Sequence, residues 1–246
     1  MQYHLLITLA LLLFSLPATA QLGIKGGLTV GGTYGSAEEF DGEKIESIDP
    51  AIGYQFGITA TVLELNAFRL NAELLYEDRR GVKNASFTII PGPDQGVSSD
   101  IKFKNSFTYL SVPLLATFGT GSFNVYIGPS VSYLLSATSE STNELTVITI
   151  AGENRSTVQE EIDLINDDRY GESYINRLNV AANIGAMIPL APKLKLDVRL
   201  YHTITDVTND DEDRSLIDRV TRPQDVRLRD DKDSTVGLQA NLVLSF

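Results

Sequence analysis

The stretch Thr235-Val236-Gly237-Leu238-Gln239-Ala240-Asn241-Leu242-Val243-Leu244-Ser245-Phe246 ends the sequence with an apolar residue at every second position. Apart from Val243, the residues between these positions are small or polar. Successive side chains of a strand point to opposite faces, so this pattern predicts a strand with one oily face and one small or polar face.

A strand of this kind fits two fold classes. A soluble β-sandwich strand alternates in the same way. This stretch, however, ends on an aromatic residue of the oily face, Phe246, as the last strand of an outer-membrane β-barrel typically does. The barrel-assembly machinery reads that terminal aromatic, and we expect Phe246 to be such an assembly signal. If residues 235–246 close a barrel, the rest of the chain must supply an odd number of similar strands.

Seven further segments repeat the alternation. In each, apolar residues at every second position oppose mostly small, polar or charged residues over about ten positions, the length of a tilted membrane-spanning strand. The pattern predicts an all-β, eight-stranded, antiparallel up-and-down transmembrane β-barrel. Its predicted strands are 22–34, 52–62, 68–77, 105–118, 123–135, 178–188, 194–201 and 235–246.

The predicted connections alternate between long and short. Outer-membrane barrels show this asymmetry, with long external loops, short periplasmic turns and both termini in the periplasm. Pro113 and Pro129 lie inside predicted strands, where we expect a bulge or a local break in the ladder. The long connections are 35–50, 81–104, 137–173 and 206–233, and the short ones lie near 65–67, 119–121 and 189–192.

The beginning of the chain has the pattern of a secretory signal peptide. An apolar run at 5–16 precedes Ala18-Thr19-Ala20, a small-x-small cleavage site, so we expect a signal peptide at 1–20 and the barrel at 21–246. The run is too short to cross a membrane as a helix. We therefore expect export across the inner membrane and location in the outer membrane.

Composition excludes several kinds of chemistry. The chain has no cysteine, which rules out disulfides, thiol chemistry and thiolate metal sites. Its formal net charge is −12, and the acidic excess falls in three predicted loops, 35–50, 137–173 and 206–233. An acidic balance of this kind argues against nucleic acid as a partner.

Five of the predicted strands carry short motifs: Gly23-Ile24-Lys25-Gly26-Gly27, Ala72-Glu73-Leu74-Leu75-Tyr76, Tyr109-Leu110-Ser111-Val112-Pro113-Leu114-Leu115, Gly128-Pro129 and Asp197-Val198-Arg199-Leu200-Tyr201. In these motifs the chain resembles the PorT-like outer-membrane β-barrel family of Bacteroidetes. The resemblance implies an OmpX-like eight-stranded barrel, in which mid-strand prolines are usual. It implies no chemistry, because most members have no assigned activity, although some relatives serve in secretion or gliding machinery.

Charged residues occupy the polar faces of several predicted strands. The interior of an eight-stranded barrel is just wide enough for side chains to fill it, and charges buried there must be paired. We therefore expect a structural ion-pair network in the lumen that includes a contact between Glu73 and Arg199. The alternative is acid–base chemistry by paired carboxylates such as Glu73 and Asp197. The expected lumen residues are Lys25, Glu73, Glu77, Arg79, Lys195, Asp197 and Arg199.

His202 is the only histidine after the predicted signal peptide. By strand parity it faces outward near the external rim, where an interfacial role is expected. A barrel hydrolase would need a serine or an acid beside it. We assign no catalytic, cofactor-binding or metal-binding residue and expect no cofactor.

Two other patterns have open interpretations. The acidic runs 209–213 and 230–233 offer carboxylates to Ca²⁺, but interleaved arginines and the lack of EF-hand spacing favour solvated loops. Aromatic residues near strand ends suit a girdle at the lipid headgroups, although they could also pack a soluble core. The expected girdle is Tyr34, Tyr54, Tyr76, Tyr109, Tyr133, Tyr201 and Phe246.

The sequence thus predicts a non-enzymatic outer-membrane barrel that presents acidic loops for adhesion, partner binding, or an envelope or secretion-machinery role. Expected partners are outer-membrane lipid or lipopolysaccharide, the barrel-assembly machinery, and a protein bound through 137–173 and 206–233. The alternatives are a narrow pore or transport protein and a barrel-type outer-membrane hydrolase.

Overall fold

The computed structural model describes residues 21–92, 95–119, 123–166, 174–213, 215, 226–229 and 232–246. The predicted signal peptide lies outside these ranges. Within them, no helix is long and apolar enough to cross a membrane. The strands are β1 (Gln21–Tyr34), β2 (Glu39–Phe40), β3 (Glu43–Lys44), β4 (Glu46–Leu65), β5 (Phe68–Gly92), β6 (Gln95–Phe118), β7 (Asn124–Thr149), β8 (Gly152–Asp163), β9 (Leu178–Ala191), β10 (Leu194–Thr203) and β11 (Ser234–Ser245).

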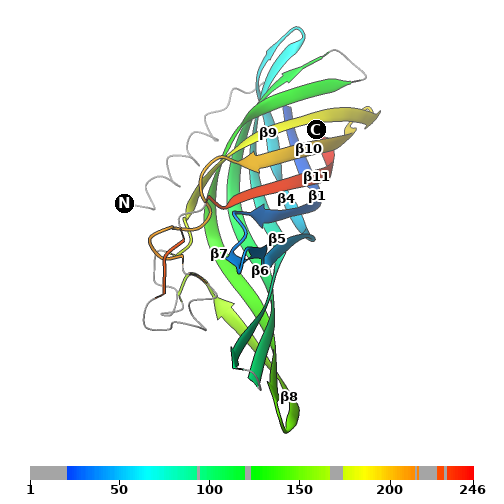
Figure 1. Cartoon of the computed structure of the whole chain (residues 1–246). Helices are drawn as coiled ribbons and strands as arrows, with labels where there is room; N and C mark the ends of the chain where they lie inside the picture. Colours follow the sequence, from blue (N-terminus) through cyan, green and yellow to red (C-terminus); the bar gives the residue numbers. More distant parts are fainter. Residues whose placement is uncertain are drawn as a thin grey trace.

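Eight strands close a barrel in the order β1, β4, β5, β6, β7, β9, β10, β11 (Figure 1). All neighbours are antiparallel, and β11 returns to β1 in an unbroken register from Ser245 opposite Gly23 to Ser234 opposite Tyr34. Closure pairs the backbone amides of every barrel strand on both sides, which a strand surrounded by lipid requires. The predicted eight-stranded barrel and its strand order are confirmed.

The last strand shows why this sequence closes with its oily face outward. Leu238 and Leu242 are 53% and 51% exposed, whereas Gln239 and Asn241 between them are 1% exposed. The same alternation continues around the barrel, so the outer surface is apolar and the lumen is largely polar. This is the arrangement expected of a wall that faces lipid.

The short connections lie together at one end of the barrel. β4 and β5 are joined by Asn66–Ala67, with Asn66 at φ 49°, and β9 and β10 are joined by residues 192–193. The long connections lie at the other, external end. The first contains the small hairpin β2–β3, whose turn at Asp41–Gly42 has positive φ at both positions, as a type I′ turn requires.

Within the described residues, two segments expected to be loops consist largely of strands. β5, β6 and β7 run on past the barrel, and β8 pairs with β7, as one row from Ala85 through Ile101 and Asn143 to Val158 shows. We call these extensions the external blade; they project together at the lower end of Figure 1. The blade comprises residues 85–92 of β5, 95–101 of β6, 139–149 of β7 and the whole of β8.

The loop expectation was wrong because it relied on polarity. A strand inside the membrane needs an oily face, so apolar alternation finds it. Beyond the membrane both faces of a strand can be polar, and pairing with neighbouring strands is enough to hold the backbone. The blade sequences are rich in Ser, Thr and charged residues. The strands therefore continue without the alternation of apolar and polar residues that marks a membrane-spanning strand.

The mid-strand prolines do not cause bulges. Pairing is interrupted beside Pro113 in the β5–β6 ladder and beside Pro129 in the β6–β7 ladder, but it resumes on the same register each time. Of the two expectations for these prolines, a bulge or a local break in the ladder, the local break is therefore correct. The actual register shift between β6 and β7 lies between Thr108 and Tyr109.

Candidate functional site: the lumen and the external mouth

Three strands supply the charged groups of the lumen. Lys25 lies on β1, the three residues Glu73, Glu77 and Arg79 on β5, and the pair Asp197 and Arg199 on β10. All six are at most 4% exposed. Each lies on the polar face of its strand, which closure turns toward the barrel axis.

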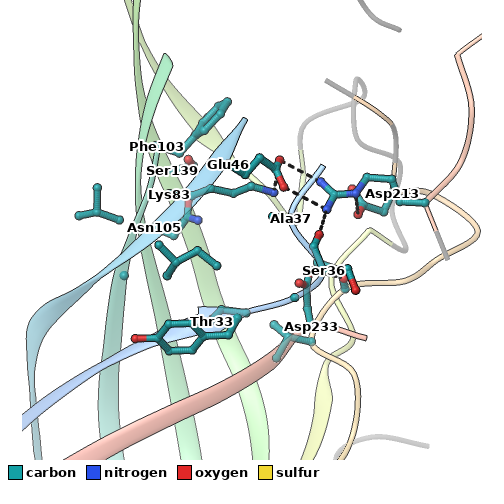
Figure 2. A pocket seen from close by; sticks show the side chains of 18 of the residues that line it. Thr33, Ser36, Ala37, Glu46, Lys83, Phe103, Asn105, Ser139, Asp213 and Asp233 are labelled. Carbon is teal, nitrogen blue, oxygen red and sulfur yellow. Dashed lines mark hydrogen bonds and ion pairs between the residues drawn. The ribbon is translucent and has the colours of Figure 1, made fainter. Parts of the chain in front are cut away.

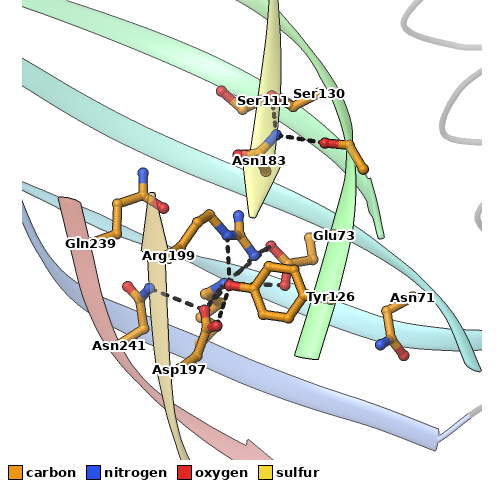
Figure 3. Close-up of polar contacts among 12 residues, drawn as sticks. Asn71, Glu73, Ser111, Tyr126, Ser130, Asn183, Asp197, Arg199, Gln239 and Asn241 are labelled. Carbon is orange, nitrogen blue, oxygen red and sulfur yellow. Dashed lines mark hydrogen bonds and ion pairs between the residues drawn. The ribbon is translucent and has the colours of Figure 1, made fainter. Parts of the chain in front are cut away.

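Four of these groups form a central cluster (Figure 3). Lys25 Nζ lies 3.1 Å from Glu73 Oε1 and 2.5 Å from Asp197 Oδ2. Arg199 Nη2 lies 2.7 Å from Glu73 Oε2, which is the contact expected from the sequence. The Tyr126 hydroxyl donates to Asp197, and Arg199 Nε donates to the same hydroxyl at 3.1 Å. Side chains of β1, β5, β7 and β10 thus meet across the interior.

The other two groups form a second cluster nearer the external end. Glu77 and Arg79 are paired, and the Ser111 hydroxyl donates to Glu77 at 2.6 Å. The Arg79 guanidinium stacks between Tyr109 and Tyr201, 4.6 and 4.8 Å from the ring centroids. Such a sandwich stabilises a desolvated cation.

Small residues make room for these large side chains. A Cβ added at Gly237 would lie 2.5 Å from the Tyr201 ring, and one at Gly185 would lie 2.3 Å from the Tyr126 hydroxyl. Facing small and large positions therefore interdigitate in the lumen, as a filled eight-stranded barrel requires.

Two tyrosines expected in the headgroup girdle are in fact lumen residues. Tyr109 and Tyr201 are buried, because they share a face with the small and charged residues of β6 and β10. Their nearness to a strand end suggests the girdle, but the alternation along each strand turns both rings inward. On the outside, Tyr54 and Tyr76 do stack, with ring centroids 6.4 Å apart.

Lys195 lies apart from the expected network. It is half-buried near the periplasmic end of β10 and lines a small cavity there together with Arg69. Within the described ranges it makes no ion pair. A lysine near a barrel mouth can reach water with its ammonium group, so it needs no buried partner.

The remaining lumen charges balance. Lys25, Arg79 and Arg199 oppose Glu73, Glu77 and Asp197, and each carboxylate contacts at least one cation. Pairing of this kind is what buried charges require, because an uncompensated charge in the interior is strongly destabilising. These six buried groups therefore form a neutral plug inside the barrel.

A third polar cluster, which we call the mouth cluster, lies at the external mouth, before the apolar span of β4 begins at Ile52. Lys83 Nζ and Arg229 Nη1 lie 2.8 and 3.0 Å from Glu46 Oε1. Arg229 Nη2 also donates to the carbonyl of Ser36 at 2.6 Å. Burial alone would raise the pKa of Glu46, but Lys83 and Arg229 outweigh it and lower that pKa below its ordinary value. The cluster joins the first and last external connections.

The sequence interpretation missed this mouth cluster. Lys83 continues the inward parity of Arg79 along β5, so extending the third predicted strand by a few residues would have found it. Glu46 could not be found in this way, because the register of β4 shifts between Pro50 and Tyr54.

His202 faces outward, as expected, and is exposed. In the described part of the chain no serine or acid is hydrogen-bonded to it. Nor do the described residues contain a group of three or more His, Asp or Glu that could hold a metal ion. Part of the acidic run 230–233 lies outside the described residues.

A closed antiparallel barrel with an apolar outer wall and a polar filled lumen defines a class of protein, the integral outer-membrane β-barrel. The chain belongs to the family described as outer membrane protein beta-barrel domain, whose sequence profile matches residues 15–209. Membership places the protein in the outer membrane. The narrower PorT-like assignment, and with it Bacteroidetes as the source, stays a prediction.

Several solved structures are similar. Neisserial surface protein A is 13% identical with a TM-score of 0.39, over 92% of this chain and 99% of that one. OprG from Pseudomonas aeruginosa is 13% identical with a TM-score of 0.38, over 92% and 96%. Ail of Yersinia pestis, in complex with the heparin analogue sucrose octasulfate, is 11% identical with a TM-score of 0.34, over 92% and 99%. No curated protein sequence matches the chain.

Proposed function

We propose that this protein is a non-enzymatic outer-membrane barrel that acts by binding a partner protein at its external face. The observation that carries the proposal is the combination of a neutral, filled lumen with an external blade built on the same strands. A plugged interior offers no path for a solute, whereas the blade offers a surface beyond the membrane.

The edge of the blade indicates a mode of binding. β8 pairs with β7 along its whole length, and no other strand in the described part of the chain pairs with its outer edge. An open edge presents backbone donors and acceptors that can accept one more strand. The exposed acids of β8 outnumber its one base: they are Glu153, Glu160, Glu161 and Asp163, and the base is Arg155, which is paired with Glu153. These acids favour a basic, extended segment as the partner.

The sequence-based partner segments fit this proposal. Segment 137–173 contains the outer half of β7 and all of β8, and segment 206–233 supplies Arg229 to the mouth cluster. Lipopolysaccharide and the barrel-assembly machinery belong to the same proposal as general partners of an outer-membrane barrel. Neither a pore nor a hydrolase has a specific observation in its favour.

Photo-crosslinking in cells tests the proposal. A photoreactive residue in place of exposed Glu161 on β8, or of exposed Asp211 in the last external connection, should capture one discrete protein. The same residue at exposed Ala67, in a periplasmic turn, is the matched control and should not capture that protein. Equal capture from Ala67, or none from both external positions, would contradict the proposal.

A further inference from the structure

The external mouth contains a cavity of about 340 Å³ (Figure 2). One wall is formed by β5, β6 and β7, and the opposite wall by the external connections. Phe103, Asn105 and Ser139 lie on the strand wall, and Asp213 and Asp233 on the connection wall. Small-molecule pockets in proteins start at roughly 300 Å³, so the volume suits a ligand of one or two rings.

A row of small side chains crosses the sheet along the strand wall of the cavity. Gly81, Asn105 and Ser139 are direct cross-strand neighbours on β5, β6 and β7. The row lies between the larger Phe103 and Phe107 on β6. The backbone of Gly32 and Thr33 packs over Gly81, and Asn105 and Ser139 lie on the cavity wall beside it.

Part of the buried lining is apolar, although Glu46, Thr208 and Asp213 of the lining are buried as well. Phe107, Leu164, Ile175 and Val207 line it and are all buried, whereas Ser36 and Lys44 line it and are exposed. The cavity therefore combines an apolar section with polar groups and has a side that reaches solvent. An apolar or aromatic body would be sheltered in this apolar section.

Among the described residues of the lining, positive and negative charges are equal in number. Lys44, Lys83 and Arg229 oppose Glu46, Asp213 and Asp233. Glu46 is held between Lys83 and Arg229, and Asp213 lies 3.7 Å from Arg229. A charged ligand would disturb this balance, so the lining favours an uncharged one.

One polar atom of the lining is unpartnered. Ser139 is 2% exposed, and its hydroxyl has no hydrogen-bond partner within the described part of the chain. Buried hydroxyls in native proteins are nearly always hydrogen-bonded. The Ser139 hydroxyl is therefore a ready partner for a polar group of a ligand.

From these observations we propose that the mouth cavity is a binding site for a small uncharged amphiphile. Its aromatic or aliphatic body packs against Phe107, Leu164, Ile175 and Val207, and its hydroxyl or carbonyl group bonds to the Ser139 hydroxyl. This proposal does not depend on the binding of a protein at β8.

Calorimetric titration of the full-length barrel in nanodiscs with 2-naphthol tests it, with empty nanodiscs to subtract partition into lipid. We expect saturable binding to the barrel. Ser139→Ala removes the hydroxyl without filling the cavity and should weaken binding about three- to ten-fold, the loss expected for one hydrogen bond. The matched control, Ser136→Ala, changes an exposed serine of β7 that does not line the cavity and should bind as the native protein does.

Two further comparisons test the chemistry. The anion 2-naphthoate should bind at least ten-fold more weakly than 2-naphthol. Ser139→Leu should abolish binding by filling the cavity, with folding verified by the shift of the unheated barrel on a gel. No saturable binding of 2-naphthol, native-like binding by Ser139→Ala, or equal binding of 2-naphthoate would each overturn the proposal.

Discussion

Arg199 and Glu73 meet inside the barrel, with Nη2 2.7 Å from Oε2, although 126 positions separate them in the chain. Each is 1% exposed. The contact joins β10 to β5 across the lumen, so it forms only when the sheet closes. It links the order of the strands to the chemistry of the interior.

Breaking this pair should destabilise the barrel. Removing one partner leaves a buried charge without compensation, which typically costs about 3–5 kcal/mol. We expect Arg199→Ala to lower the free energy of unfolding, measured by urea titration in detergent, by an amount in this range. Arg155→Ala, which removes an exposed pair with Glu153 on the blade, is the control and should cost less than about 1 kcal/mol.

Replacing both partners should recover much of that loss. In Glu73→Leu with Arg199→Met, no charge is left unpaired, because Lys25 and Asp197 still contact each other at 2.5 Å. Replacing a buried ion pair by apolar groups of similar volume is often neutral. A double variant no more stable than Arg199→Ala would show that the pair does not act as a unit.

The filled lumen predicts that the native barrel conducts no ions. The clusters around Arg199 and Arg79 occupy successive levels of the interior, and both arginines are buried. Reconstitution into planar bilayers should give no single-channel steps above those of bilayers without protein. Reproducible steps from properly inserted protein would favour the pore alternative instead.

The mouth cluster predicts a dependence on pH. The pKa of Glu46 is lowered in the folded protein, so the folded state favours its ionised form. The resulting stabilisation is present above the unfolded-state pKa, about 4.3, and is lost as the pH falls through the folded-state value. Glu46→Gln should therefore be less stable than the native protein at pH 7, and the difference in unfolding free energy should shrink below about pH 4. A difference that stays constant from pH 7 to pH 3 would contradict the assignment.

Phe246 should matter for assembly more than for stability. Its side chain is 67% exposed on the outer wall, and its backbone N–H donates to the carbonyl of Leu22 at 2.9 Å, a bond that any residue can make. We expect Phe246→Ala to reduce the amount of barrel in the outer membrane while refolding in detergent is unchanged. Phe123→Ala, another exposed aromatic, is the control and should leave both quantities unchanged.

The barrel could be predicted from the sequence because lipid imposes a strict rule on each strand. Leu238 must face out and Gln239 must face in, and a period of two follows. The same alternation predicts that Glu73 and Arg199 both face the lumen. Because the lumen is narrow, few other charged side chains can pair with them there. Lys195 lies on the inward face, as its position in the alternation predicts. It lies near the periplasmic end of the barrel, where a lysine can reach water and needs no buried ion-pair partner.

The external parts could not be predicted by that rule. β8 has exposed side chains on both faces apart from Ile162, so its sequence lacks the alternation that reveals a membrane strand. The mouth cluster depends on Arg229, which comes from a distant connection, and on a register shift in β4. Tertiary contacts, and not local patterns, decide these positions.

Two adjacent residues of the last strand test the central claim of a closed barrel most directly. The chain has no cysteine, so a single spin label can be placed at Leu242→Cys or at Asn241→Cys without other changes. In lipid bilayers, electron paramagnetic resonance should show the label at position 242 accessible to oxygen and shielded from a water-soluble nickel reagent. The label at position 241 should be shielded from both. The reverse result, or free access of the nickel reagent to both positions, would contradict a barrel with an oily wall and a filled polar interior.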